Sequence, residues 1–213
     1  MAKVKMTKKS TRIDMAAMTD IAFLLLTFFI MTSTARLPEP VEVNTPASTV
    51  QIKLPDTNLA TITVAGQRAY FGTVGQDTRA LMLEEMGKKY GLTFTEDEIK
   101  RFSLIESFGV DVRELKGFIA LEGAKRMEPG VQKGIALDSI DNQLSDWIQS
   151  AREANAKLLI KNDVPKKDRR DIDIAIKGDA DEDFPTIKKV IDILQKRGKN
   201  NFYLVTGLRG EDF

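Results

Sequence analysis

The sequence predicts a single N-terminal transmembrane helix followed by an α/β (α+β) domain that carries a helical insertion. An apolar run of membrane-spanning length near the N-terminus, a proline-rich stretch after it and alternating strand and helix patterns further on lead to this prediction. The 213 residues are enough for one hydrophobic core with accessory elements. The expected segments are a basic tail at 1–15, the transmembrane helix at 16–35, an extended linker at 36–58 and a folded domain at 59–213, with the insertion at about 77–135.

The composition excludes several kinds of chemistry. The chain contains no cysteine and no histidine, which removes disulfides, thiol catalysis, the usual zinc sites and any Ser-His triad. The net charge of +1 gives no global electrostatic case for binding nucleic acid. No motif picks out a catalytic carboxylate or lysine. The sequence therefore predicts a protein that is not an enzyme and that holds no metal or cofactor.

Residues 16–35 form the predicted membrane segment. A helix of this length spans about 30 Å, which is the thickness of a bilayer's hydrocarbon core. Five basic residues precede the run, and the positive-inside rule therefore predicts a cytoplasmic N-terminus and an external C-terminal domain: Lys3, Lys5, Lys8, Lys9 and Arg12.

Two other interpretations of this segment stay open. A cleaved signal peptide also has a basic start and a short apolar run, but Asp14 and Asp20 lie at the apolar run, where secretion signals rarely carry acids. A buried helix of a soluble domain is the other alternative. The stretch from Ile21 to Met31 has no polar face, which argues against it.

Asp20 is the unusual residue of the segment. A charge within a membrane helix costs about 2.5–3.5 kcal/mol at mid-helix on insertion scales. Its place near the cytoplasmic end allows the interpretation that it merely reaches the lipid headgroups. The helical face of Asp20 instead favours contact with a protein partner or with a water-filled path, because Asp20 shares this face with other polar side chains. This stripe consists of Asp20, Leu24, Thr27, Met31 and Thr34.

The stretch "DMAAMTDIAFLLLTFFIM" resembles the membrane anchor of the ExbD/TolR biopolymer-transport proteins. Their signature is an acid a few residues into a single N-terminal helix, followed by leucine- and phenylalanine-rich sequence. The resemblance implies that Asp20 is the proton-carrying aspartate and that Asp14, beside Arg12, is a second acid found in many members. The family usually has a proline three residues before the key acid, and this chain has Ala17 there. The "IKLP" at 52–55 is also similar to a family motif.

This resemblance implies a function and a set of partners. The chain would be a proton-channel or stator component of a motor in the bacterial inner membrane, with its C-terminal domain in the periplasm. The motor would use the proton motive force to energise outer-membrane transport. The implied partners are an ExbB/TolQ-like multi-span ring, a second copy of this chain in a homodimer, and a TonB-like or TolA-like transducer.

Alternative functions also stay open at this stage. The helix could be a passive anchor for a periplasmic module that contacts peptidoglycan or another envelope component. TolR-like envelope maintenance uses the same anchor chemistry. A flagellar-stator or gliding-type motor has no supporting peptidoglycan-binding signature in the sequence.

The first half of the domain is expected to contain a hairpin and several helices. Residues 59–72 alternate in polarity around a turn at Ala65, Gly66 and Gln67, which predicts a β-hairpin. Helical patterns fill 77–153, and the stretches "TEDE" at 95–98 and "DVRE" at 111–114 have the form of capping boxes. Apolar stripes in this region are interpreted as core, with a partner surface as the alternative: Val112, Leu115, Phe118 and Ile119, then Ile140, Leu144, Trp147, Ile148 and Ala151.

The C-terminal part predicts a β-α-β unit, with a strand at 171–177, a helix at about 185–197 and a strand at 201–206. Pro185 near the start of the helix and Gly198 after its end fit these limits. The acid run at 178–183 has the spacing of an EF-hand but lacks its glycine and glutamate, and is therefore expected to be a solvated loop. The mixed charges of 161–171 predict a surface loop.

Overall fold

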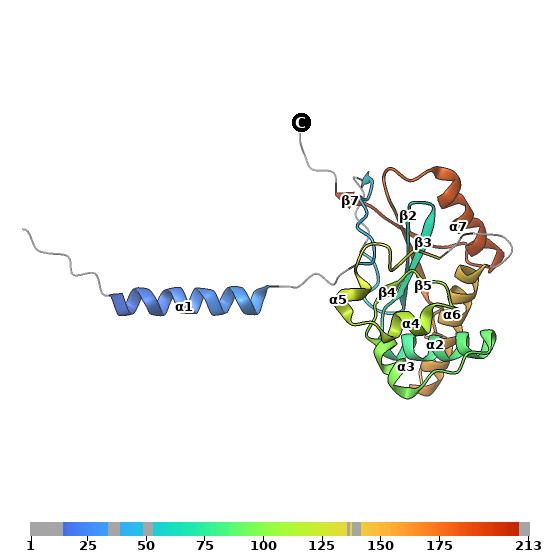
Figure 1. The fold of residues 1–213 in the computed structure, drawn as a ribbon, viewed down its shortest axis with the longest axis horizontal. Coiled ribbons are helices and arrows are strands. Elements are labelled where there is room, and N and C mark those ends of the chain that lie inside the picture. The colour runs from blue at the N-terminus through green and yellow to red at the C-terminus, as the bar shows by residue number, and fades with distance from the viewer. Residues whose placement is uncertain (1–14, 34–38, 49–52, 136, 138–141, 209–213) are drawn as a thin grey trace, which may run out of the picture. The chain divides into compact units, whose positions relative to one another are not determined.

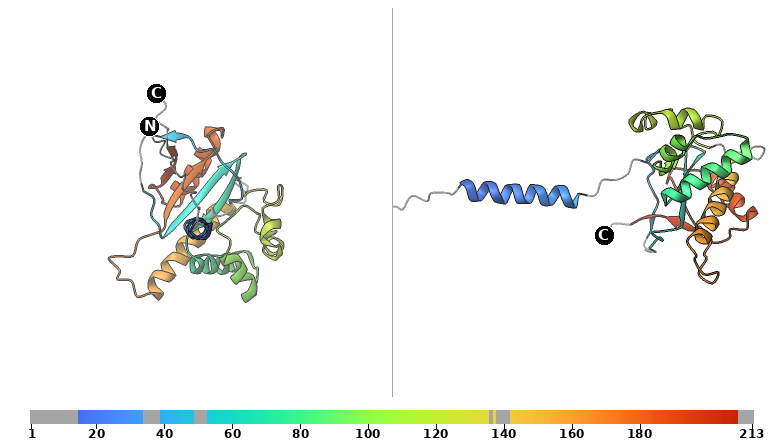
Figure 2. Two further views of the ribbon diagram at one scale, coloured as in Figure 1. Left: turned by 90° about the vertical axis from the view of Figure 1, so that its left-hand side faces the viewer. Right: turned by 90° about the horizontal axis from the view of Figure 1, so that it is seen from below.

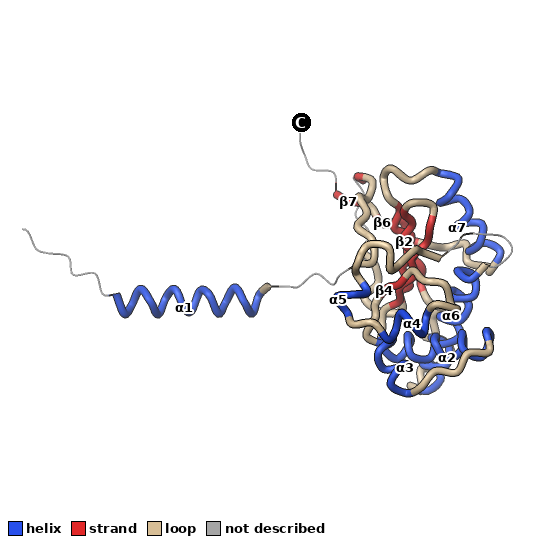
Figure 3. Tube along the Cα trace, in the orientation of Figure 1, coloured by secondary structure: helices blue, strands red, loops and turns tan. Residues whose placement is uncertain are grey.

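A computed structural model describes residues 15–33, 39–48, 53–135, 137 and 142–208, and it separates into two units, Met1–Pro38 and Glu39–Phe213 (Figure 1). The first unit contains helix α1 (Met15–Thr32). The second unit is a mixed α/β domain, shown by element type in Figure 3. The fold class predicted from the sequence is therefore confirmed.

The domain places one main β-sheet beside several helices. Its strands are β2 (Leu59–Ala65), β3 (Arg68–Thr73), β4 (Ser107–Phe108), β5 (Asp173–Gly178) and β6 (Tyr203–Val205), and a separate two-stranded sheet joins β1 (Ala47–Ser48) to β7 (Gly207–Leu208). Its helices are α2 (Gln76–Tyr90), α3 (Glu96–Ser103), α4 (Leu115–Ala120), α5 (Gly123–Arg126), α6 (Gln143–Lys161) and α7 (Phe184–Lys196).

The main sheet is mixed in direction and has the strand order β4-β3-β2-β5-β6. Strands β4, β3 and β2 are antiparallel neighbours, whereas β2, β5 and β6 run parallel. Figure 2 shows the hairpin strands β2 and β3 beside β5. Helix α7 is the crossover between the parallel strands β5 and β6, which confirms the β-α-β unit predicted at the C-terminal end.

The predicted β-hairpin is also confirmed, and its turn explains its register. Gly66 and Gln67 both have positive φ angles, 57° and 60°, as a two-residue type I′ turn requires. The acid run at 178–183 contacts this turn through Glu182. Both carboxylate oxygens of Glu182 accept a hydrogen bond from the Gln67 amide at 3.2 Å. The acid run is therefore not a fully solvated loop, which corrects the sequence-based expectation.

The two predicted capping boxes have different outcomes. Thr95 and Glu98 form a complete capping box at the start of α3. The second prediction is wrong, because α4 begins at Leu115 rather than after Asp111. The carboxylate of Asp111 instead accepts a hydrogen bond from the Arg113 amide, two residues ahead, at 2.8 Å. This local bond stabilises a turn that competes with helix initiation.

The core lies on one face of the main sheet. The inward side chains of β2, including Ile62 and Val64, join those of β5 and of the helices in one buried cluster. Trp147 of α6 lies fully buried in this cluster and stacks on Phe102, with ring centroids 6.1 Å apart. Phe108 of β4 contacts the same indole edge-on at 4.8 Å. The core therefore joins elements from distant parts of the chain.

The predicted apolar stripes are part of this core. The first stripe is buried throughout, at Val112, Leu115, Phe118 and Ile119, as is the described part of the second, at Leu144, Trp147, Ile148 and Ala151. Ile140 lies outside the described residues. The interpretation of both stripes as core packing is confirmed for the described residues. In α7, Val190 and Leu194 are buried.

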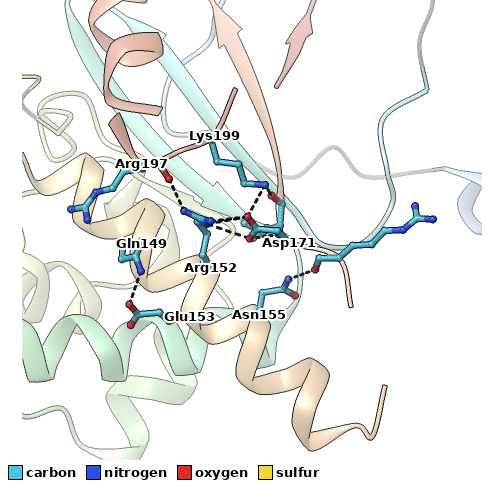
Figure 4. Close-up of polar contacts among 9 residues, drawn as sticks. Gln149, Arg152, Glu153, Asn155, Asp171, Arg197 and Lys199 are labelled. Carbon is cyan, nitrogen blue, oxygen red and sulfur yellow. Dashed lines mark hydrogen bonds and ion pairs between the residues drawn. The ribbon is translucent and has the colours of Figure 1, made fainter. Parts of the chain in front are cut away.

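A polar network near the start of β5 joins α6 to the segment that follows α7 (Figure 4). Asp171 accepts hydrogen bonds from Arg152 of α6 and is paired with Lys199 at 3.0 Å. Arg152 also donates to the carbonyl oxygen of Arg197 at 2.9 Å. Burial of Asp171 raises its pKa, but the hydrogen bonds from Lys199 and Arg152 outweigh this effect and hold the pKa below its ordinary value. The charges of this network thus stabilise the packing of α6 on the C-terminal segment.

Candidate functional site

Helix α1 has the length and composition of a membrane span. Its 18 residues have a mean hydropathy of 1.9, and at 1.5 Å per residue they extend about 27 Å. No residue of α1 is buried by the described part of the chain, so large apolar side chains such as Phe23, Phe29 and Ile30 are exposed. A soluble protein rarely leaves an apolar surface of this size uncovered. The helix therefore needs a cover of lipid or of another protein.

Asp20 lies in the second turn of α1, about 8 Å along the axis from Met15. It is exposed, and its carboxylate makes no ion pair or hydrogen bond to any residue in the described ranges. A carboxylate in apolar surroundings needs a charge partner, hydrogen-bond donors or a proton. What satisfies Asp20 must therefore come from outside the described chain or from a bound proton.

The threonines of α1 differ from Asp20 because the helix itself satisfies them. The Thr27 hydroxyl donates to the carbonyl oxygen of Leu24 at 2.9 Å, and Thr19 and Thr32 donate to Met15 and Phe28 at 2.8 Å. Sequence reasoning grouped Thr27 with Asp20 on one polar stripe and missed this internal bond. Thr27 retains only its acceptor capacity toward a partner.

The structure brings only part of the predicted site together. Asp20 and Thr27 lie on one continuous helix with Leu24 and Met31, as the stripe requires. The other two predicted site residues, Asp14 and Thr34, lie outside the described residues. The helix therefore provides a single described ionisable group, Asp20, within an otherwise uncharged segment.

The chain that follows α1 is attached to the domain from Glu39 onward, which sequence reasoning missed. Glu39 forms an ion pair with Lys177 of β5. The Asn44 carbonyl accepts from the Ala180 amide at 2.7 Å, and the Pro46 carbonyl accepts from the Gly207 amide at 3.0 Å. Strand β1 then pairs in parallel with β7. No local sequence pattern indicates these contacts, because their partners lie more than a hundred residues away.

Two half-buried acids of the domain, Glu85 and Asp146, have several partners each. Glu85 accepts hydrogen bonds from Lys157 and Lys88 at 2.6 and 2.9 Å, and these bonds lower its pKa. Asp146 accepts from Lys89, Tyr90 and Arg197. Among the described residues, no three acidic side chains gather as a metal site would need. Glu85 and Asp146 are thus each satisfied by side chains of the domain, unlike Asp20.

An apolar helix of membrane-spanning length, with one acid that has no partner among the described residues and a mixed α/β domain after it, is typical of a membrane-anchored protein. The family model described as biopolymer transport protein ExbD/TolR matches residues 6–208, and the chain belongs to this family. The match includes α1, the docked segment (residues 39–48) and the helices between β3 and β5. No curated protein and no solved structure matches the chain. Family membership assigns the chain to biopolymer transport and to the membrane-anchored proteins.

Proposed function

We propose that this chain is the proton-carrying stator component of an inner-membrane motor that uses the proton motive force to energise outer-membrane transport. Membership of the ExbD/TolR family supports this proposal. The observation that carries it is Asp20, an exposed acid without a described partner on a helix that has no other charge. A passive anchor gains nothing from such a residue, whose cost rises toward about 2.5–3.5 kcal/mol as the charge approaches the middle of a membrane helix.

The proton cycle follows from the two charge states of Asp20. The protonated carboxyl is neutral and tolerates apolar surroundings, whereas the carboxylate seeks a polar or cationic partner. Alternation between these states changes which surface of a surrounding protein α1 prefers. One charge that crosses a potential of 100 mV releases about 2.3 kcal/mol, and this free energy drives the movement. Thr27 has a secondary role on the same helical face, and Asp14 and Thr34, which flank α1 in the sequence, have secondary polar roles.

The proposal also includes the orientation of the chain in the membrane and the proteins that it contacts. The basic residues before α1 support a cytoplasmic N-terminus and a periplasmic domain. Two copies of the chain lie within an ExbB/TolQ-like multi-span ring, which covers the exposed apolar surface of α1. The domain passes the work to a TonB-like or TolA-like transducer. Glu39–Ser48 links the movement of α1 to the domain, because its contacts attach it to β5 and β7.

Replacing Asp20 tests the proposal. Asp20→Asn keeps size and polarity but removes titration, and we expect it to abolish transport that depends on the proton gradient. Asp20→Glu keeps a titratable group and should retain part of the activity, and Asp14→Asn should have a milder effect than Asp20→Asn. Protein level and co-purification of the ring protein are measured in parallel, and both should remain unchanged. Full transport by Asp20→Asn would leave a passive membrane anchor as the better interpretation.

A second experiment tests the topology. The N-terminal sequence of the protein extracted from membranes should begin in the basic tail, because the proposal needs an intact α1. A mature protein that begins near Arg36 would show that the apolar run is a cleaved signal peptide, and the motor proposal would then be wrong.

A further inference from the structure

The docked segment, residues 39–48, lies against the face of the main sheet that is opposite to the core. Along β5, Ile174 and Ile176 belong to the core cluster, and Lys177 therefore points to the other face. Lys177 pairs there with Glu39. Burial alternates along the segment, as in an extended chain with one side against a surface. Its half-buried residues include Val41, Val43 and Thr45, and the residues between and after them, Glu42, Asn44 and Pro46, are exposed.

The two faces of the sheet differ in composition where β2 pairs with β5. The core face carries branched aliphatic side chains: Ile62, Val64, Ile174 and Ile176. The face beneath the docked segment carries smaller or polar side chains: Thr61, Thr63, Ala175 and Lys177. Exposure of threonine, alanine and lysine to water costs less than exposure of isoleucine and valine. The docked segment can therefore leave this face without exposing the core.

The polar contacts of the docked segment follow one another along the chain. From the α1 end they are the Glu39–Lys177 ion pair, the hydrogen bond from the Ala180 amide to the Asn44 carbonyl, the hydrogen bond from the Gly207 amide to the Pro46 carbonyl, and the β1-β7 pairing. The first of these is weak, because the Glu39 side chain is 52% exposed. None of residues 39–48, all of which the structure describes, belongs to the core cluster. The segment can thus open from its Glu39 end while the core stays folded.

We propose that the docked segment is a releasable latch that sets how far the domain can reach from α1. Because α1 ends at Thr32, docking leaves residues 33–38 as the tether, which can span at most about 20 Å. Release of the segment lengthens the tether to residues 33–48, which can span at most about 55 Å. Movement of α1 is transmitted along the chain to Glu39 before the other contacts. The latch goes beyond the proposed function, because it uses neither Asp20 nor a proton.

The distance between two spin labels on the full chain in detergent tests the latch. The chain has no cysteine, so Asn44→Cys in the segment and Lys188→Cys on α7 provide two exposed attachment sites. Dilution into unlabelled chain ensures that each distance comes from one molecule. Docking should give a narrow distance, and Glu39→Lys should increase a broad, longer component about threefold, because the reversed charge repels Lys177. Glu39→Lys combined with Lys177→Glu restores opposite charges and should recover the docked distance.

Glu42→Lys is the matched control for this experiment. Glu42 lies on the exposed side of the segment and has no ion pair among the described residues, so the same change of charge should leave the docked distance unchanged. An unchanged distance in Glu39→Lys, an equal shift in Glu42→Lys, or no recovery in the charge-swapped variant would overturn the proposal.

A disulfide lock tests whether transport needs the release, and this step alone rests on the proposed function. Ala47 and Gly207 are paired neighbours in β1 and β7, so cysteines at both positions can form a bond that holds the segment in place. Transport should fall at least tenfold in the oxidised double variant, because the bond removes the released state, and should return after reduction. Each single-cysteine variant should transport equally before and after reduction.

Equal transport by the oxidised and reduced double variant, with the disulfide confirmed by peptide mass, would show that the latch does not need to open and would overturn the proposal. The spin-label distances do not depend on transport. Failure of the latch is therefore distinguishable from failure of the proposed function, which Asp20→Asn tests separately.

Discussion

Helix α1 and the α/β domain differ in how their acidic residues are paired and in how far their aromatic residues are buried. In the domain, Asp171 has two cationic partners and Trp147 is fully buried. In α1, Asp20 has no described partner and Phe29 is 66% exposed. The domain pairs this acid and buries this aromatic ring within its own fold, whereas the described part of the chain does neither for Asp20 and Phe29. Asp171, whose cationic partners lie in the same fold, is thus distinguished from Asp20, for which the structure describes no partner.

The largest effect on the domain is expected from Trp147→Ala. Loss of this buried indole leaves a cavity among Phe102 and Phe108, which should lower the free energy of unfolding by about 3–5 kcal/mol. Phe29→Ala in α1 should leave the unfolding of the domain unchanged, because Phe29 contributes nothing to its core. Chemical unfolding of the full chain followed by circular dichroism measures both. Equal destabilisation by the two variants would remove the distinction between the regions.

The second effect concerns the acid that stabilises the fold. Asp171→Asn leaves Arg152 and Lys199 without their charge partner and should cost about 1 kcal/mol, because the Asp171 side chain is 39% exposed and solvent screens its charge. Because the folded state lowers the pKa of Asp171 below its ordinary value of 3.8, the carboxylate contributes stability above that pH. This contribution is lost as the pH falls through the lower pKa of the folded state.

Unfolding measured between neutral pH and about pH 2 checks this prediction. The wild-type domain should lose stability in the acid range, and Asp171→Asn should lose less over the same interval. Asp168→Asn is a suitable control, because Asp168 is an exposed acid in the neighbouring loop. An acid dependence that Asp171→Asn leaves unchanged would show that this carboxylate does not contribute through its charge.

Local patterns predicted much of this structure. The hairpin around Gly66, the capping box at Thr95 and the β-α-β unit with Pro185 and Gly198 each depend on residues close in sequence. The turn at Asp111 was mistaken for a helix start because one side chain can bond either to the first turn of a helix or to an amide two residues ahead. Sequence alone does not show which bond the surrounding packing favours.

The features that sequence reasoning missed depend on distant partners. Attachment of Glu39 to Lys177 and of β1 to β7 joins residues at opposite ends of the domain sequence. The pocket between the hairpin turn and the first turn of α7 likewise brings Arg68 and Lys189 to one place only through folding. Asp20 was predicted as a candidate because an acid in an apolar run is visible locally. Its lack of a partner becomes apparent only when every described contact is known.

The third prediction tests which contacts attach residues 39–48, the segment after α1, to the domain. Lys177→Gln removes the ion pair with Glu39 and should detach the start of the docked segment, at a cost of about 1 kcal/mol or less to the domain. Hydrogen exchange of the full chain should become faster at the Ala180 and Gly207 amides, which donate to this segment. Lys188→Gln should leave their exchange unchanged. If exchange at both amides stays slow in Lys177→Gln, the backbone contacts alone hold the segment.

The smallest effect is expected from Thr27→Val. Valine keeps the shape of threonine, and the lost hydroxyl proton was directed to the Leu24 carbonyl rather than to a partner. Only the acceptor capacity of the hydroxyl is lost to the helical face, so we expect transport to fall about threefold, equivalent to about 0.6 kcal/mol. The same growth or uptake assay used for Asp20→Asn measures this effect. Complete loss of transport in Thr27→Val, with normal protein level and ring association, would mean that this acceptor is essential. Transport would then depend on Thr27 as well as on Asp20. A hydrogen bond within the helix would therefore not show that a polar side chain of α1 is dispensable for transport.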